Sequence, residues 1–173
     1  MTAGYHRPVP PRPTARATLS RAALKPELLA RAQAALDTAR AAHAAAVEGA
    51  THSEARAEND KDTRGLEQSY LARGLAGRVA ELEGALSAIA LLPEVGGGTR
   101  STIGAVITAE DADGKAVRYF LAPWGGGEVL TGDVVVVTPS SPIGRALLGR
   151  ELDDDVEIQR PGGARTLTIT AIA

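Results

Sequence analysis

Residues 138–172 read TPSSPIGRALLGRELDDDVEIQRPGGARTLTITAI, and this stretch contains the strongest fold signals of the chain. Ser141 precedes Pro142, so the two residues stand where a helix takes its N-cap and its first turn. Gly149 stands where such a helix would end. We therefore expect a short helix over residues 141–149, followed by an acidic run and a strand.

Strand patterns surround this helix. Runs rich in Val, Ile and Thr predict five strands, at residues 103–109, 116–121, 133–138, 155–159 and 166–172. Asp113-Gly114 separates the first two runs and Pro161-Gly162-Gly163 the last two, and both are typical of hairpin turns. Residues 93–173 are thus predicted to form an α+β domain, a small antiparallel sheet with one short helix on a face.

Two apolar seams precede this domain, with steps of three and four residues. The first comprises Leu29, Ala32, Leu36, Ala39, His43, Ala46 and Ala50, and the second Ala72, Leu75, Val79, Leu82, Leu86 and Ile89. They predict an antiparallel coiled coil over residues 25–92, about 45 Å long, with Pro26 and Pro93 at its outer ends. We expect some glycines of the second helix to allow close approach to the alanine face opposite.

The amino-acid composition excludes several classes of function. The 173 residues carry 19 Lys and Arg against 21 Asp and Glu and no cysteine, which excludes disulfides and thiolate chemistry and gives no global attraction to nucleic acid. No apolar run approaches the ~20 residues of a membrane span, and no signal-peptide core is evident, so we expect a cytoplasmic protein without membrane contact. Residues 1–24 are rich in Pro and Arg without an apolar period, and we expect a disordered tail.

Residues 51–63, THSEARAENDKDT, lie between the two seams and contain no long apolar side chain. Glu54, Glu58 and Asp60 crowd this turn of the coiled coil. A polar loop with helix-capping residues explains them, and so does a carboxylate site for Mg²⁺, provided that another macromolecule supplies the remaining ligands. Phosphate-loop and dinucleotide-binding signatures are absent from the sequence.

The Ser-Pro-Ile helix start, the Leu-Gly end, the acidic run and the Pro-Gly-Gly hairpin resemble the C-terminal domain of the Gre transcript-cleavage factors, which bind bacterial RNA polymerase. The resemblance covers about residues 26–173 and implies a coiled coil followed by an FKBP-like domain. It implies that Ser141, Pro142 and Ile143 belong to the surface that docks at the polymerase secondary channel. The coiled coil would then reach the active site and the 3′ end of the nascent RNA.

The same resemblance assigns roles to the tip. Glu58-Asn59 matches the Glu-Asn pair of cleavage-competent tips, whereas Ala55 stands where those tips carry aspartate and Glu54 comes one residue earlier. Glu58, Asp60 and Glu54 are the implied catalytic carboxylates, and Glu58 and Asp60 would share a Mg²⁺ ion with the polymerase. The chain would be no enzyme on its own, and at most a cofactor for cleavage by the polymerase. Stimulation of cleavage and occupation of the channel by a divergent regulator both remain open.

Two other functions stay as alternatives. A prolyl isomerase would need an aromatic pocket, for which the domain offers Tyr119, Phe120 and Trp124 in one segment. A noncatalytic adaptor would bind another protein along its hairpin. We expect a monomer, and the resemblance carries the general expectations of transcription regulation and DNA binding.

Overall fold

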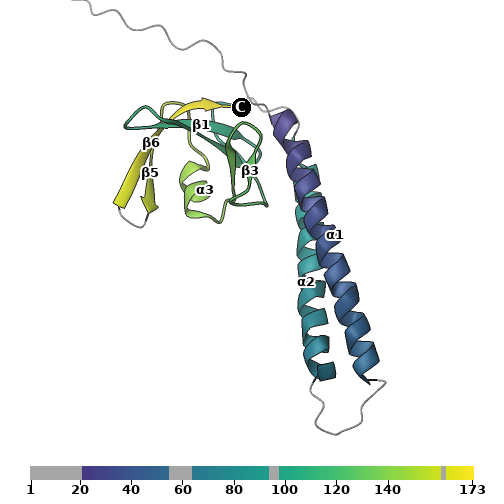
Figure 1. Cartoon of the computed structure of the whole chain (residues 1–173). Helices are drawn as coiled ribbons and strands as arrows, with labels where there is room; N and C mark the ends of the chain where they lie inside the picture. Colours follow the sequence, from purple (N-terminus) through teal and green to yellow (C-terminus); the bar gives the residue numbers. More distant parts are fainter. Residues whose placement is uncertain (1–20, 55–63, 94–97, 161–162) are drawn as a thin grey trace, which may run out of the picture.

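The computed structural model describes residues 21–54, 64–93, 98–160 and 163–173. Two long helices, α1 (Arg21–Glu54) and α2 (Arg64–Ala90), lie side by side and form a rod that extends from a globular part (Figure 1). Every residue of the two predicted seams is buried or half-buried. Leu36 and Ala39 of α1 pack with Leu82 of α2 in the core of the rod. The prediction of two long N-terminal helices followed by an α+β domain is confirmed.

Helix α1 already includes Arg21, so it begins before Pro26, where we expected its start. Residues 21–24, which we assigned to the tail, belong to the helix. Pro26 has no N–H to donate to the carbonyl of Ala22, and this costs the helix one hydrogen bond. Complete burial of Leu24 offsets that cost, and the largely buried guanidinium of Arg21 donates to the carbonyls of Gly104 and Pro93.

Within the described residues, the globular part contains six strands and one short helix. They are β1 (Val106–Asp111), β2 (Ala116–Leu121), β3 (Val129–Leu130), β4 (Val134–Val137), α3 (Pro142–Leu147), β5 (Asp155–Arg160) and β6 (Gly163–Ile172). The strand order in the sheet is β3-β4-β2-β1-β6-β5. One feature corrects our prediction of an antiparallel sheet, since β2 and β4 run parallel, with Tyr119 opposite Val135. The two-residue strand β3, which the sequence pattern did not predict, reverses the chain once more before β4.

The sheet buries side chains on both faces. Successive residues of a strand point to opposite sides, so Phe120 packs towards the rod with Leu24 and Leu28, whereas Tyr119 packs with Leu147 of α3. The rod therefore covers one face of the sheet and α3 part of the other. On the face that carries α3, the residues that this short helix does not cover remain accessible.

The predicted cap of α3 is confirmed. The Ser141 hydroxyl accepts a hydrogen bond of 3.0 Å from the Gly144 N–H and donates one of 2.7 Å to the Thr138 carbonyl, and Pro142 is the first residue of the helix. Gly144 is buried against Thr138, where a Cβ would collide with the carbonyl oxygen. The chain therefore turns sharply into α3 and brings the start of this helix onto the sheet.

The expectation of close approach was wrong for three glycines of α2. Gly74, Gly77 and Gly84 are exposed, and a Cβ at each would meet no described atom within 4 Å. They do not provide close contact between the two helices. Each therefore weakens α2 through backbone entropy without a compensating contact that the structure describes.

We expect Gly74→Ala, Gly77→Ala and Gly84→Ala to raise the free energy of unfolding by about 0.5–1 kcal/mol each, because alanine restricts the unfolded chain and finds open space in the helix. In a chain of this size, 1 kcal/mol corresponds to about 2–4 °C in Tm. Circular dichroism during heating measures the shift. The control is Gly144→Ala, which should lower Tm because of the clash with Thr138, and unchanged or lower Tm values in the α2 variants would contradict the prediction.

Candidate functional site

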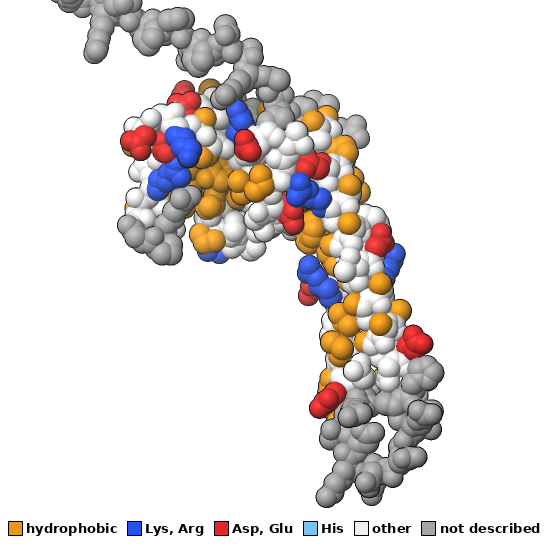
Figure 2. Space-filling model, viewed as in Figure 1, with side chains coloured by type: hydrophobic (Ala, Val, Ile, Leu, Met, Phe, Trp, Pro, Cys, Tyr) orange, Lys and Arg blue, Asp and Glu red, His pale blue; other side chains and the backbone are white. Residues whose placement is uncertain are grey.

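A groove of about 550 Å³ lies beside α3, on the face of the sheet that the rod does not cover. It is lined by Lys115, Ala116, Val117, Arg118, Tyr119, Asp133, Val135, Ile143 and Arg165. Helix α3 has six residues and covers only part of this face. Val117, Val135 and Ile143 consequently stay half-buried, and Figure 2 shows hydrophobic side chains gathered on the globular part next to cationic ones. The groove is a candidate binding surface.

Opposite charges balance at one end of the groove. Asp111 at the end of β1 forms an ion pair with Arg165 of β6, and its Oδ1 accepts the backbone N–H groups of Asp113 at 3.1 Å and Lys115 at 2.8 Å. These bonds shape the turn between β1 and β2 and place Lys115 at the rim of the groove. Lys115, Arg118 and Asp133 also line the groove, so three cations face two carboxylates around it. The groove therefore combines apolar surface with a small excess of positive charge.

The pKa of Asp111 lies below its ordinary value. The main cause is the hydrogen bond from the Lys115 backbone N–H, and the ion pair with Arg165 adds to it. Both interactions favour the carboxylate over the carboxylic acid. Asp111 is therefore ionised. Its carboxylate connects the turn between β1 and β2 to Arg165 of β6, which lines the groove.

The structure brings part of the predicted docking surface to this groove. Ile143 lines the groove. The Ser141 hydroxyl caps α3, and Pro142, the first residue of this helix, is exposed. Sequence reasoning named these three residues for docking and Tyr119 for a pocket, but missed Lys115, Val117, Val135 and the other lining residues. The lining comes from β2, β4, β6 and the turns before β2 and β4, and no local pattern indicates that these segments meet α3 at one place.

The described residues that flank the predicted tip, Glu54 and Arg64, are the end of α1 and the start of α2. Glu54 is the last residue of α1, and Glu58 and Asp60 lie outside the described residues, as does Ala55. Within the described ranges, no group of three His, Cys, Asp or Glu side chains could hold a metal ion. The predicted Mg²⁺ site therefore remains a prediction from the sequence.

The three aromatic residues of the isomerase alternative do not line one pocket. Tyr119 borders the groove, but Phe120 is fully buried on the other face of the sheet. Trp124 packs against the rod. The alternation of side chains along β2 separates Tyr119 from Phe120, so the groove has one aromatic wall and the geometry gives this alternative no support.

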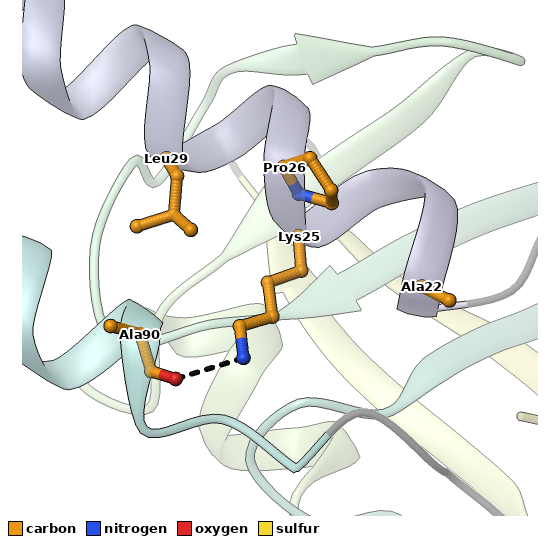
Figure 3. A pocket seen from close by; sticks show the side chains of 5 residues that line it. All are labelled: Ala22, Lys25, Pro26, Leu29 and Ala90. Carbon is orange, nitrogen blue, oxygen red and sulfur yellow. Dashed lines mark hydrogen bonds between the residues drawn. The ribbon is translucent and has the colours of Figure 1, made fainter.

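A second hollow, of about 330 Å³, lies where α1 begins and α2 ends (Figure 3). Lys25 crosses it, and its Nζ donates to the carbonyls of Ala90 at 2.8 Å and Leu92 at 2.7 Å. The last carbonyls of a helix lack intrahelical partners and attract cations. Lys25 is thus a cap for α2, and we assign this hollow a structural role.

No described helix is long and apolar enough to cross a membrane.

We expect Asp111→Asn to make the fold less stable near neutral pH and to bring a smaller loss at low pH. A carboxyl whose pKa is lower in the folded chain stabilises it above the unfolded pKa of about 4, and this contribution is lost as the pH falls through the folded value. Urea unfolding at a series of pH values from 7 downwards measures the difference. Asp113→Asn in the same turn is the control, and an equal difference at every pH would refute the assignment.

Comparisons with known proteins identify one sequence family and several relatives. The family described as "Transcription elongation factor, GreA/GreB, C-term" matches residues 99–173. GreA of Polaromonas naphthalenivorans is 33% identical over 133 residues, which cover 69% of this chain and 77% of that protein. GreA of Verminephrobacter eiseniae is 35% identical over 100 residues, 56% of this chain, and the match spans only 61% of that protein.

Among solved structures, the GreA factor homolog 1 (Gfh1) protein of Thermus thermophilus is similar over 84% of this chain and 94% of its own, with 21% sequence identity and a TM-score of 0.37. The family match falls on the sheet, α3 and the groove, and the GreA relative from Polaromonas extends over much of the chain. The chain belongs to the GreA/GreB family of transcription elongation factors.

Proposed function

We propose that this chain binds RNA polymerase through the groove and carries its acidic segment, residues 54–62, into the secondary channel. Family membership is the observation that carries the proposal, and the architecture agrees with it. The groove lies on the globular part, whereas the rod leads away from it (Figure 1). Helix α1 alone has 34 residues and thus a length of about 50 Å. Such a protein can dock at one place and act at another.

The groove suits a partner that inserts an apolar side chain. Val117, Val135 and Ile143 offer half-buried apolar surface, and the charge of Arg165 is balanced by Asp111. Interfaces of this kind gain most of their affinity from a few buried anchors. We infer that the polymerase places such an anchor beside Ile143, near the exposed Pro142.

The acidic segment suits a role at a metal centre of the polymerase. Carboxylate oxygens are ligands that Mg²⁺ prefers, and Glu54, Glu58 and Asp60 supply them within one short segment. An ion held there would activate a water molecule and stabilise the charge that develops on the phosphate during RNA cleavage. The chain itself would deliver carboxylates into a narrow space, as a monomer in the cytoplasm, while the polymerase performs the reaction.

Two effects on transcription are compatible with this proposal. Glu58 and Asn59 match the cleavage-competent tip, which favours stimulation of transcript cleavage. Ala55 replaces its aspartate, which favours a regulator that occupies the channel without cleavage. A noncatalytic adaptor that binds another protein along the rod is the remaining alternative, and binding to the polymerase separates it from both.

Ile143→Ser should weaken binding to core RNA polymerase about tenfold, because the loss of the apolar contact between Ile143 and the polymerase anchor costs on the order of 1–2 kcal/mol. Fluorescence anisotropy with labelled protein measures the affinity. The control is Leu91→Ser, which removes an apolar side chain that is 83% exposed just after α2 and does not line the groove. Equal affinities of the Ile143 and Leu91 variants would exclude the groove as the docking surface. Absence of binding by the unaltered protein would refute the proposal as a whole.

Glu58→Ala should slow RNA cleavage in a stalled, backtracked elongation complex with Mg²⁺ by about a hundredfold, because a ligand of a reacting metal ion contributes several kcal/mol. Glu81→Ala removes an exposed carboxylate from the side of the rod and should leave the rate unchanged. If the unaltered protein causes no cleavage but competes with an authentic Gre factor for the complex, the chain is a channel-occupying regulator. Cleavage that survives in Glu58→Ala, Asp60→Ala and Glu54→Ala would contradict a role of the tip.

A further inference from the structure

Two residues of α1 hold the globular part by directional bonds. Glu27 Oε2 accepts the backbone N–H of Thr131 at 2.9 Å, and Arg31 donates to Glu128 Oε2 at 2.7 Å and to the Val129 carbonyl at 2.9 Å. Glu27 and Arg31 are one helical turn apart and also pair with each other at 2.8 Å. We call this set of contacts the clasp. It joins the rod to a single short segment, residues 128–131, which contains β3.

The two parts are also joined by the hydrogen bond from Arg21 to the Gly104 carbonyl and by apolar contacts next to the clasp. Leu28 lies between the two clasp residues and is fully buried. A Cβ on Gly125 would come within 2.8 Å of Leu28 Cδ1, and Gly125 has a φ of 86°, a conformation that favours glycine. The hydrophobic effect is not directional, so this packing holds the rod against the sheet without selecting one angle strongly. Hydrogen bonds weaken steeply when their geometry changes, and the clasp supplies such bonds.

The charge states agree with a formed clasp. The pKa of Glu27 lies below its ordinary value, first because of the Thr131 backbone N–H and then because of Arg31. The pKa of Arg31 is raised, mainly by Glu128 and then by Glu27. The three side chains are 26–41% exposed. Because exposed ion pairs contribute little to stability, the loss of the clasp should leave the protein folded.

The length of the rod turns small rotations at the clasp into large displacements. From Arg31 to the end of α1 at Glu54 the helix rises about 35 Å, so a rotation of about 10° would move the tip by about 6 Å. Metal–oxygen contacts tolerate errors of only a few tenths of an ångström. A protein that docks at one end and acts at the other therefore needs a fixed angle between its two parts.

We propose that Glu27 and Arg31 are positioning residues, which set the direction of the rod relative to the groove through the clasp and so determine where the tip lies when the groove is occupied. The proposal about the free protein rests on the geometry of the clasp alone. Its consequence in transcription rests on the proposed function. The two levels require separate measurements.

The first measurement concerns the free protein. The chain has no cysteine, so spin labels can be attached at Ala44→Cys on the exposed side of α1 and Thr166→Cys on β6, and their separation measured by double electron–electron resonance. We expect a narrow distribution for the otherwise unaltered chain, and a distribution broadened or shifted by several ångströms for Arg31→Gln and Glu27→Gln. Arg40→Gln is the matched control, because Arg40 pairs with Glu83 at the same distance of 2.7 Å but within the rod. Distributions equal to the control would overturn the proposal.

The second measurement concerns the polymerase. Arg31→Gln should keep its affinity for core RNA polymerase within about twofold, but reduce the effect of the tip on a backtracked elongation complex at least tenfold at saturating protein. Arg40→Gln should change neither quantity. If Arg31→Gln is as effective as Arg40→Gln at saturation, the clasp does not position the tip. If the unaltered protein does not bind the polymerase, the proposed function fails, and the resonance measurement still decides the role of the clasp in the free protein.

Discussion

The β-sheet buries apolar side chains on both faces, and the placement of the rod and of α3 depends on this two-sided burial. Phe120 and Tyr119 are neighbours in β2 but belong to different cores, one shared with α1 and one with α3. Complete burial of a side chain such as Leu28 contributes about 1.5–3 kcal/mol, so the rod is a structural partner of the sheet. Helix α3 is too short to cover the second face, and the groove is the part of that face which it leaves open.

Local signals in the sequence were sufficient for most of the fold. Ser141 and Pro142 define the start of α3, and the seams define both helices, because capping and periodicity depend on neighbours in the chain. Strand β3 was missed because two residues carry no alternation. Its absence from the prediction also led to the wrong orientation of β4, since one additional reversal of the chain changes an antiparallel neighbour into a parallel one.

Tertiary contacts explain the remaining differences. Pro26 normally indicates a helix start, but burial of Leu24 and the hydrogen bonds of Arg21 hold the preceding turn in the helix. The groove could not be predicted, because its lining comes from three strands and α3. The acidic tip is the opposite case, since Glu58 and Asp60 were predicted from composition and from resemblance to a family. The structure describes the rod that leads to them but not these residues themselves.

The joint between the rod and the sheet is not itself a candidate binding surface, unlike the groove and the tip. The groove offers an apolar surface and the tip offers carboxylates, whereas Glu27 and Arg31 contact neither. Alanine supplies four of the seven seam residues of α1, and Ala32 and Ala46 each bury little more than a methyl group. Such a rod is held straight by many small contacts, and its direction is set where it meets the sheet. Changes at the joint therefore alter geometry while both functional surfaces stay intact, and divergence at this point would change what the tip reaches without changing what the groove binds.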